Sequence, residues 1–245
     1  MPFHTGRGKM LLKNYQIILR TLVPNNYNMQ ATNKLQRFLL YCGILSSILY
    51  ILTDIIAVSL WKDYSYSSQT VSELFAIDAP TQTFVVICFI IYAPLIYAFG
   101  AGIWLSAGEK RSLKFAAALI VAKEILGLIG TLFFPLHLRG VPGNYSDIMH
   151  GIVTAVGVFL CMFPAMIAGA IAFKGTFRIY SIITMLLFMV FGVLTGTQQP
   201  QLSANLPTPM MGIWERINIY GYMLWIVVLA LILLKRQNKP SPAQV

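Results

Sequence analysis

The sequence predicts an all-α integral membrane protein in which six transmembrane helices form one bundle. Of its 245 residues, 57% are hydrophobic and only 11% are charged, whereas a soluble globular domain carries roughly 25% charged residues. The deficit of charge extends along the whole chain. Six apolar segments are long enough to cross a hydrocarbon layer about 30 Å thick, which takes roughly 20 helical residues.

We expect the six spans at residues 38–61, 83–105, 115–135, 148–173, 179–197 and 214–234. Residues 1–37 are predicted to be a cytoplasmic extension. Within it, Met10–Val23 has the composition of an interfacial amphipathic helix, although translation from Met29 would leave that stretch out of the native protein. Residues 237–245 are expected to be a disordered tail because they are rich in Pro, Ser and Gln.

The basic residues indicate the orientation of the bundle. Most of the 18 Lys and Arg residues fall in the N-terminal extension, the two short connections after spans two and four, and the tail. By the positive-inside rule both termini are therefore cytoplasmic. The net charge of +10 is explained by this bias, and no basic stripe interleaved with aromatic residues indicates a nucleic-acid partner.

Three ionisable residues fall inside the predicted spans, where an unpaired charge costs several kcal/mol. They are Asp54 in the first span and Lys123 and Glu124 in the third. Adjacent helical residues point about 100° apart, so we expect Lys123 and Glu124 to find partners on other helices, with Asp54–Lys123 as one pair. Such a pair fixes helix register or handles protons or substrate.

Histidines and a carboxylate gather at the predicted outer face. Asp147 and His150 are three residues apart and share a helical face, and His137 follows the third span. These three residues form a candidate zinc site. The alternatives are that Asp147 caps its helix and that His150 is an interfacial histidine.

Two further motifs lie at the same face. Thr70 and Glu73 have the spacing of a capping box, and the alternative is that Ser72 or Glu73 enters a cleft between spans. Glu215 and Arg216 open the last span, where Arg216 is a candidate for binding an anion or a lipid phosphate, or for pairing with Glu73 or Asp147. The polar groups of four spans thus predict a cavity open to the outer side.

Several short motifs give the chain a family resemblance. These are the run from Tyr66 to Leu74, Phe134-Pro135 at the end of the third span, the segment from Asp147 to Gly151, and the start of the last span at Trp214. Over residues 38–236 the chain resembles the prokaryotic membrane family known as domain of unknown function 998. The resemblance implies a multi-pass protein of a prokaryotic inner membrane and supplies no reaction.

Two hypotheses for function follow from these residues. In the first, the protein binds or transports a small or lipid-like molecule through an outward-facing polar cavity, with no cofactor, and Asp54, Lys123 and Glu124 act as a buried switch. In the second, it is a membrane-embedded hydrolase whose zinc activates water. A structural or accessory role is the third possibility, and the bilayer is the partner common to all three.

Overall fold

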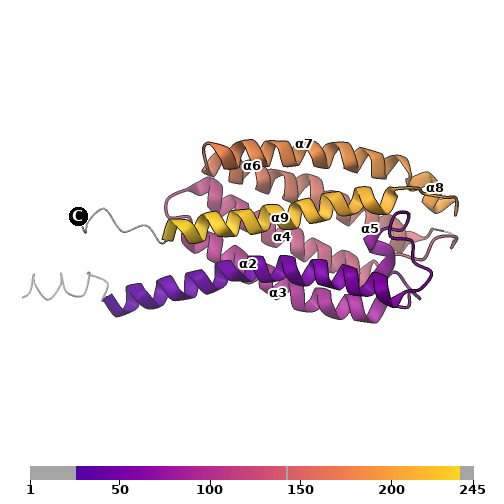
Figure 1. The fold of residues 1–245 in the computed structure, drawn as a ribbon, viewed down its shortest axis with the longest axis horizontal. Coiled ribbons are helices and arrows are strands. Elements are labelled where there is room, and N and C mark those ends of the chain that lie inside the picture. Colours follow the sequence, from indigo (N-terminus) through magenta and orange to yellow (C-terminus); the bar gives the residue numbers. More distant parts are fainter. Residues whose placement is uncertain (1–25, 142, 238–245) are drawn as a thin grey trace, which may run out of the picture.

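The computed structural model of the protein describes residues 26–141 and 143–237 as helices packed side by side along one long axis (Figure 1). Six helices in this part of the chain are long and apolar enough to cross a membrane. The predicted number of spans and the all-helical class are therefore confirmed. The predicted amphipathic helix at Met10–Val23 lies outside the described residues, as do residues 238–245 of the predicted tail.

The helices that contain the six spans have the following bounds. They are α2 (Asn26–Leu60), α3 (Gln82–Ser106), α4 (Arg111–Phe133), a fourth span made of α5 (Tyr145–Val156), the π-helix η2 (Gly157–Met162) and α6 (Phe163–Ala172), then α7 (Thr176–Thr197) and α9 (Met211–Gln237). A 3₁₀-helix η1 (Val71–Phe75) follows α2, and the short helix α8 (Gln199–Ser203) follows α7.

The first helix begins earlier than the predicted span. α2 starts at Asn26, within the stretch assigned to the polar extension. Hydropathy identifies only the part of a helix that faces hydrocarbon, whereas the helix itself continues as long as its residues favour helical backbone. The extension and the first span are thus continuous in structure over residues 26–37.

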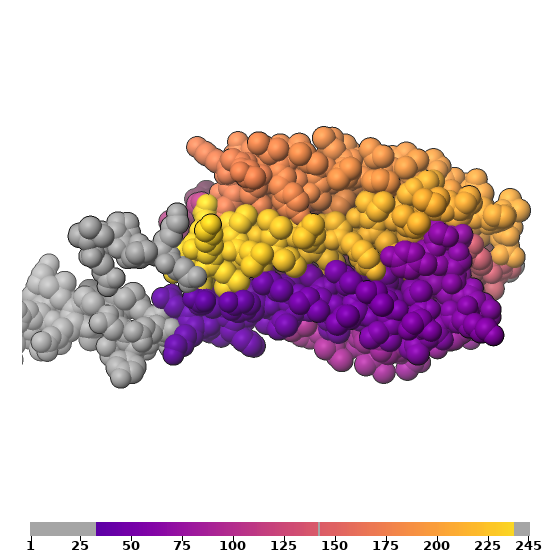
Figure 2. All heavy atoms as spheres, viewed as in Figure 1, coloured from indigo at the N-terminus to yellow at the C-terminus, as the bar shows by residue number. Residues whose placement is uncertain are grey.

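The six spans form a closed ring. Each span packs against the next one in sequence, and α9 packs against α2, which closes the ring between the last span and the first. Figure 2 shows α9 lying between α2 and α7 on one face of the molecule. A ring of this kind surrounds an interior to which every span contributes one face.

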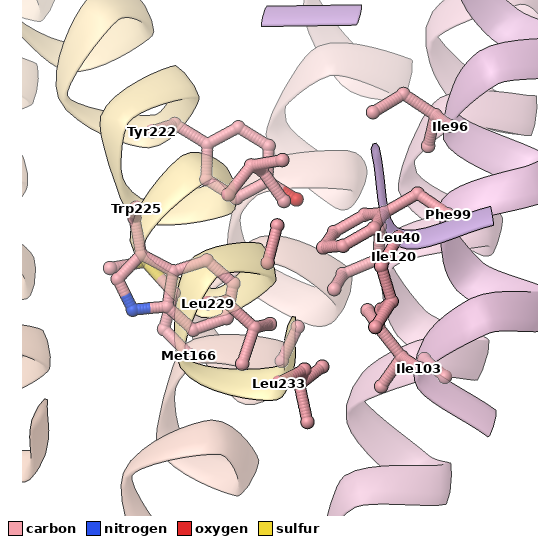
Figure 3. Packing of buried hydrophobic residues seen from close by; sticks show 14 of the residues in the cluster. Leu40, Ile96, Phe99, Ile103, Ile120, Met166, Tyr222, Trp225, Leu229 and Leu233 are labelled. Atoms are coloured by element: carbon pink, nitrogen blue, oxygen red, sulfur yellow. The ribbon is translucent and has the colours of Figure 1, made fainter. Parts of the chain in front are cut away.

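Large apolar side chains fill much of that interior. Phe99, Ile120, Met166 and Trp225 are fully buried and belong to one cluster, whose members project toward each other from several helices (Figure 3). Many Ile and Leu side chains on the outer faces are exposed. In a membrane those exposed faces contact lipid, so the apolar surface needs no protein partner.

The two ends of the bundle differ in kind. The loop end carries the longer connections 61–81, 134–144 and 198–210, whereas the turn end carries the short connections 107–110 and 173–175 and both ends of the described chain (Figure 1). Gly108 and Gly175 adopt positive φ in the two short turns, a conformation that glycine tolerates best. Most of the polar side chains singled out in the sequence lie at the loop end, in its longer connections and the adjoining ends of the helices.

Close packing of α2 on α3 gives a first prediction. A Cβ at Gly43 would come within 2.5 Å of the ring of Phe99, which is fully buried and has no room to move. We expect Gly43→Ala to destabilise the bundle by about 1–3 kcal/mol, as overpacking does, seen as a lower unfolding temperature in detergent.

The matched control is Gly151→Ala on α5, because a Cβ at Gly151 meets nothing within 4 Å. Removing a helical glycine there should leave the unfolding temperature unchanged or raise it. Equal unfolding temperatures for the two variants would contradict the packing described here.

Candidate functional site

A buried ion pair joins the first span to the last at the loop end. Arg216 on α9 donates through Nε to Asp54 Oδ2 and through Nη2 to Asp54 Oδ1 of α2, both at 2.9 Å. Both side chains are about 2% exposed. Tyr220, one turn along α9, also donates its hydroxyl to Asp54. A bidentate pair of this geometry is the strongest kind of charged hydrogen bond that a protein makes.

The remaining donors of Arg216 hold the first loop. Nη2 donates to the Tyr64 hydroxyl at 2.8 Å, and Nη1 donates to the carbonyls of Tyr66 and Gln69, both at 3.1 Å. The guanidinium also stacks 4.1 Å from the centre of the Tyr66 ring. All five N–H groups of Arg216 therefore have an acceptor. Burial raises the pKa of the Tyr64 hydroxyl well above its usual value, although Arg216 opposes that shift.

One glycine makes this approach possible. Gly212, one turn before Arg216, donates its N–H to the Ser67 carbonyl at 2.9 Å. A Cβ at this position would collide with the carbonyl oxygens of Tyr66 and Gln69. The loop backbone therefore lies directly on the N-terminal turn of α9.

The predicted Asp54–Lys123 pair is wrong. Asp54 takes Arg216 instead because a guanidinium matches both carboxylate oxygens at once. Lys123 lies 3.5 Å from Glu124, its neighbour in sequence, although the helical geometry had predicted partners on other helices for both residues. The four-carbon lysine stem is long and flexible enough to bring the two charged groups together, although adjacent helical residues point about 100° apart.

A second charged pair ties the three loops of the loop end together. Glu73 in η1 is fully buried and accepts from Arg139 through Nε at 2.7 Å and Nη2 at 2.8 Å. Arg139 also donates to Thr208 and to the Ser68 carbonyl, each at 3.2 Å. Connections 61–81, 134–144 and 198–210 thus meet at one guanidinium.

The capping box predicted at Thr70 and Glu73 is present, and the same carboxylate serves both the cap and the ion pair. The proposed pairing of Arg216 with Glu73 or Asp147 is wrong, since Arg139 holds Glu73. Ser72 is half-buried and makes no side-chain hydrogen bond within the described residues. Glu215 accepts the Val71 N–H, so the last span also caps η1.

The histidine cluster orders the second loop. Asp147 accepts the His137 N–H at 2.8 Å and lies 3.2 Å from His137 Nδ1. Asn144, rather than Asp147, is the N-cap of α5, and Asp147 is the third helical residue of its capping box. His150 is 7% exposed, and its Nδ1 lies 2.9 Å from the Phe134 carbonyl.

The candidate zinc ligands therefore come together only in part. His137 and Asp147 touch, whereas His150 is turned toward the backbone of Phe134. Within residues 26–141 and 143–237, no group of three or more His, Cys, Asp or Glu side chains is arranged to hold a metal ion. The contacts seen here position the loop backbone.

The intramembrane pair at Lys123 and Glu124 differs from the pairs at the loop end. Glu124 is 5% exposed, and its Oε2 receives no hydrogen bond from the described residues. Lys123 approaches this oxygen only at 3.5 Å, longer than a good charge-assisted hydrogen bond. A buried carboxylate with an unused acceptor oxygen is rare in folded proteins.

Three tyrosines lie near this pair. Lys123 Nζ lies 5.6 Å from the ring centre of Tyr222, whose hydroxyl is buried and has no hydrogen-bond partner in the described part of the chain. The Tyr222 ring projects from α9 toward the middle of the bundle (Figure 3). Tyr92 on α3 and Tyr50 on α2 stand 5.5 Å apart, ring centre to ring centre. Tyr50 lies within electrostatic range of Glu124, and the Tyr92 hydroxyl is close enough to interact with the Glu124 side chain by a hydrogen bond.

The fourth span is irregular at the same level. Its π-helix η2 lies against Lys123, because a Cβ at Gly157 would come within 4.0 Å of Lys123 Cγ. Cys161, also in η2, is within electrostatic range of Lys123. Single π-turns inside α-helices occur often at functional sites, so this irregularity marks the level of Lys123 and Glu124.

The polar groups of the loop end contact one another through the hydrogen bonds described above. A groove of about 480 Å³ lies at the turn end, beside Lys110 and Arg236. Sequence reasoning also missed Arg139, because nothing in the local pattern of its loop indicates a partner. One signal could have found it. Few basic residues lie on the acid-rich side of the bundle, so a basic residue there can be expected to pair with one of the acids.

A ring of six apolar helices with buried charges defines a polytopic membrane protein. The chain belongs to the family described as protein of unknown function (DUF998), whose family model matches residues 44–232, and the resemblance noted in the sequence is thereby confirmed. Neither the curated proteins nor the solved structures contain a match to the chain.

The Asp54–Arg216 pair should contribute strongly to the stability of the bundle. Removing one partner of a buried ion pair leaves the other charge uncompensated and costs about 3–5 kcal/mol. We expect Asp54→Asn to lower the unfolding temperature in detergent strongly.

The same substitution at the exposed Asp63, nine residues further along, should change the unfolding temperature little. If Asp54→Asn proved as stable as Asp63→Asn, the pair would not be structural.

Proposed function

We propose that the protein binds a small or lipid-like molecule inside the bundle, at the level of Lys123 and Glu124, and carries it across the membrane. The observation that carries the proposal is the buried Glu124 oxygen without a hydrogen-bond donor in the described residues. An unsatisfied carboxylate in a membrane is costly, and a ligand with a donor group would remove that cost.

The contrast with the loop end supports this choice. Asp54 and Glu73 are each held by a guanidinium through two hydrogen bonds, so neither has capacity to spare for a ligand. Glu124 has a loosely placed ammonium, and its Oε2 receives no hydrogen bond from the described residues. The charges of the loop end therefore belong to the scaffold, and the pair in the middle belongs to the site.

The chemistry of the site indicates the class of ligand. Glu124 accepts hydrogen bonds, Lys123 donates them, and the Tyr222 hydroxyl can do either. The rings of Tyr50 and Tyr92 offer apolar and π faces beside these groups. A molecule with an amine or hydroxyl group on an apolar body matches this combination.

The π-helix supports movement as well as binding. In η2 the regular hydrogen-bond ladder of the fourth span is interrupted next to Lys123. Such a segment can return to α-helical geometry at small cost and shift the side chains beside it. In the proposal, η2 and Lys123 rearrange to admit the ligand from one side and release it on the other.

The proposed location is the inner membrane of a prokaryote, with the turn end and both termini in the cytoplasm. Its support is the concentration of Lys and Arg at the turn end, where Lys110, Arg111, Lys174 and Arg236 lie, set against the acids of the loop end.

The hydrolase alternative rests on the contact between His137 and Asp147. Its test is the zinc content of protein purified without chelators, wild type beside His150→Ala. If the carrier proposal holds, the wild type should not contain stoichiometric zinc that depends on His150. Zinc at one equivalent in the wild type and none in His150→Ala would contradict the carrier proposal's expectation and favour the hydrolase hypothesis, which hydrolysis of lipid ester or amide substrates would then test.

The carrier proposal predicts that Glu124→Gln separates binding from stability. The pair is loose at 3.5 Å and the Lys123 side chain is 24% exposed, so losing the Glu124 charge should lower the unfolding temperature less than Asp54→Asn does. In a thermal-shift screen of small amines, amino alcohols and hydroxylated lipids, a ligand at 100 times its Kd stabilises the wild type by about 2.7 kcal/mol.

That stabilisation should vanish in Glu124→Gln and persist in Glu109→Gln, the matched change at an exposed residue of the turn end. Ligands that stabilise Glu124→Gln as well as the wild type would overturn the assignment of the site.

A further inference from the structure

A groove at the turn end collects cations from three parts of the chain. It is lined by Lys110, Ser112, Ile171, Ala172, Lys174 and Arg236, which come from the start of α4, the end of α6 and the end of α9. Its volume is about 480 Å³. Three of its six lining residues are basic and none is acidic.

Two of these cations lie close to the same aromatic ring, that of Phe173. Lys110 Nζ lies 5.5 Å and Arg236 Cζ 4.3 Å from the centre of the buried Phe173 ring. Lys110 also donates to the Ala172 carbonyl at 3.2 Å. Partial desolvation and the charge of Arg236 lower the pKa of Lys110. The fold thus holds two like charges close together, although they repel.

No counter-ion relieves that repulsion within the described residues. Glu109 is the one acidic residue of the sequence at the turn end, and it forms none of the described ion pairs. An arrangement of like charges around an opening is stabilised when an anion enters it.

The start of α4 adds neutral donors to the same groove. This helix of 23 residues begins at Arg111, and its N-cap Lys110 makes no side-chain capping bond. The Leu113 N–H donates to the Lys110 carbonyl at 3.0 Å, whereas the N–H groups of Arg111 and Ser112 have no acceptor within the helix and lie at the positive end of its dipole. With the Ser112 hydroxyl beside them, they complete a site suited to phosphate oxygens.

The neighbours of the groove favour a lipid over a soluble anion. Ile171, in the groove wall, is 61% exposed and belongs to the apolar outer surface of the fourth span. The groove also lies where the spans end, at the depth of lipid headgroups. A ligand with a phosphate and acyl chains would place the phosphate among the cations and a chain along Ile171.

We propose that this groove binds the phosphate headgroup of an anionic phospholipid. The site is separate from the Lys123–Glu124 pair, so this proposal is independent of the carrier function.

Native mass spectrometry of the detergent-purified protein tests the proposal. The protein is titrated with phosphatidylglycerol or with phosphatidylcholine of the same acyl chains. We expect the wild type to bind phosphatidylglycerol more tightly. Each basic residue near an anionic headgroup contributes about a fivefold factor, so Lys110→Gln/Arg236→Gln should bind it about 25-fold more weakly.

Lys235→Gln is the matched control, since Lys235 adjoins Arg236 and is exposed outside the groove lining. It should keep the affinity of the wild type, and Lys110→Arg/Arg236→Lys should keep most of it, which separates loss of charge from loss of fold. Equal binding of the two lipids, or unchanged binding by the Gln double variant, would overturn the proposal. Displacement of the lipid by millimolar inorganic phosphate would assign the groove to a soluble anion and overturn the lipid assignment.

Discussion

The bidentate pair between Asp54 and Arg216 is the constraint on which the loop end of the bundle depends. It joins the first span to the last where the ring of helices closes. Its desolvation cost is offset only because every donor of Arg216 finds an acceptor. Those acceptors include the carbonyls of Tyr66 and Gln69, so the pair also fixes the first loop. The Glu73–Arg139 pair then extends the same order to the other two loops.

Glu124 differs from these carboxylates because one of its oxygens has no hydrogen-bond donor among the described residues. The structure satisfies its other deeply buried carboxylates through guanidinium groups, backbone N–H groups and hydroxyls. Glu124 has an ammonium at 3.5 Å and one oxygen without a donor among the described residues. The fully paired carboxylates of the loop end therefore stabilise the fold, and the incompletely paired Glu124 belongs to the proposed binding site. The π-helix beside Lys123 supports the same division, because local irregularity and incomplete pairing coincide at one level of the membrane.

The number and approximate position of the spans could be predicted from sequence, because apolar length is a property of single segments. The Thr70–Glu73 capping box could be predicted for the same reason. Pairings between spans could not. Asp54 has both Lys123 and Arg216 as possible partners, and only the ring order, which places α9 beside α2, decides between them. Arg139 was missed because its partners lie in two other loops. The groove at the turn end was also missed, since its cations are distant in sequence.

The most direct test of the central claim is carbodiimide labelling. Dicyclohexylcarbodiimide modifies carboxyl groups that lie in apolar surroundings and are not held by a strong cation. The purified protein is treated with the reagent in detergent and digested, and adducts are located by mass spectrometry. The account predicts modification of Glu124, with Asp54 and Glu73 protected by Arg216 and Arg139. Labelling of Asp54 or Glu73 with Glu124 unmodified would contradict it, because the loop end would then hold the reactive carboxyl group.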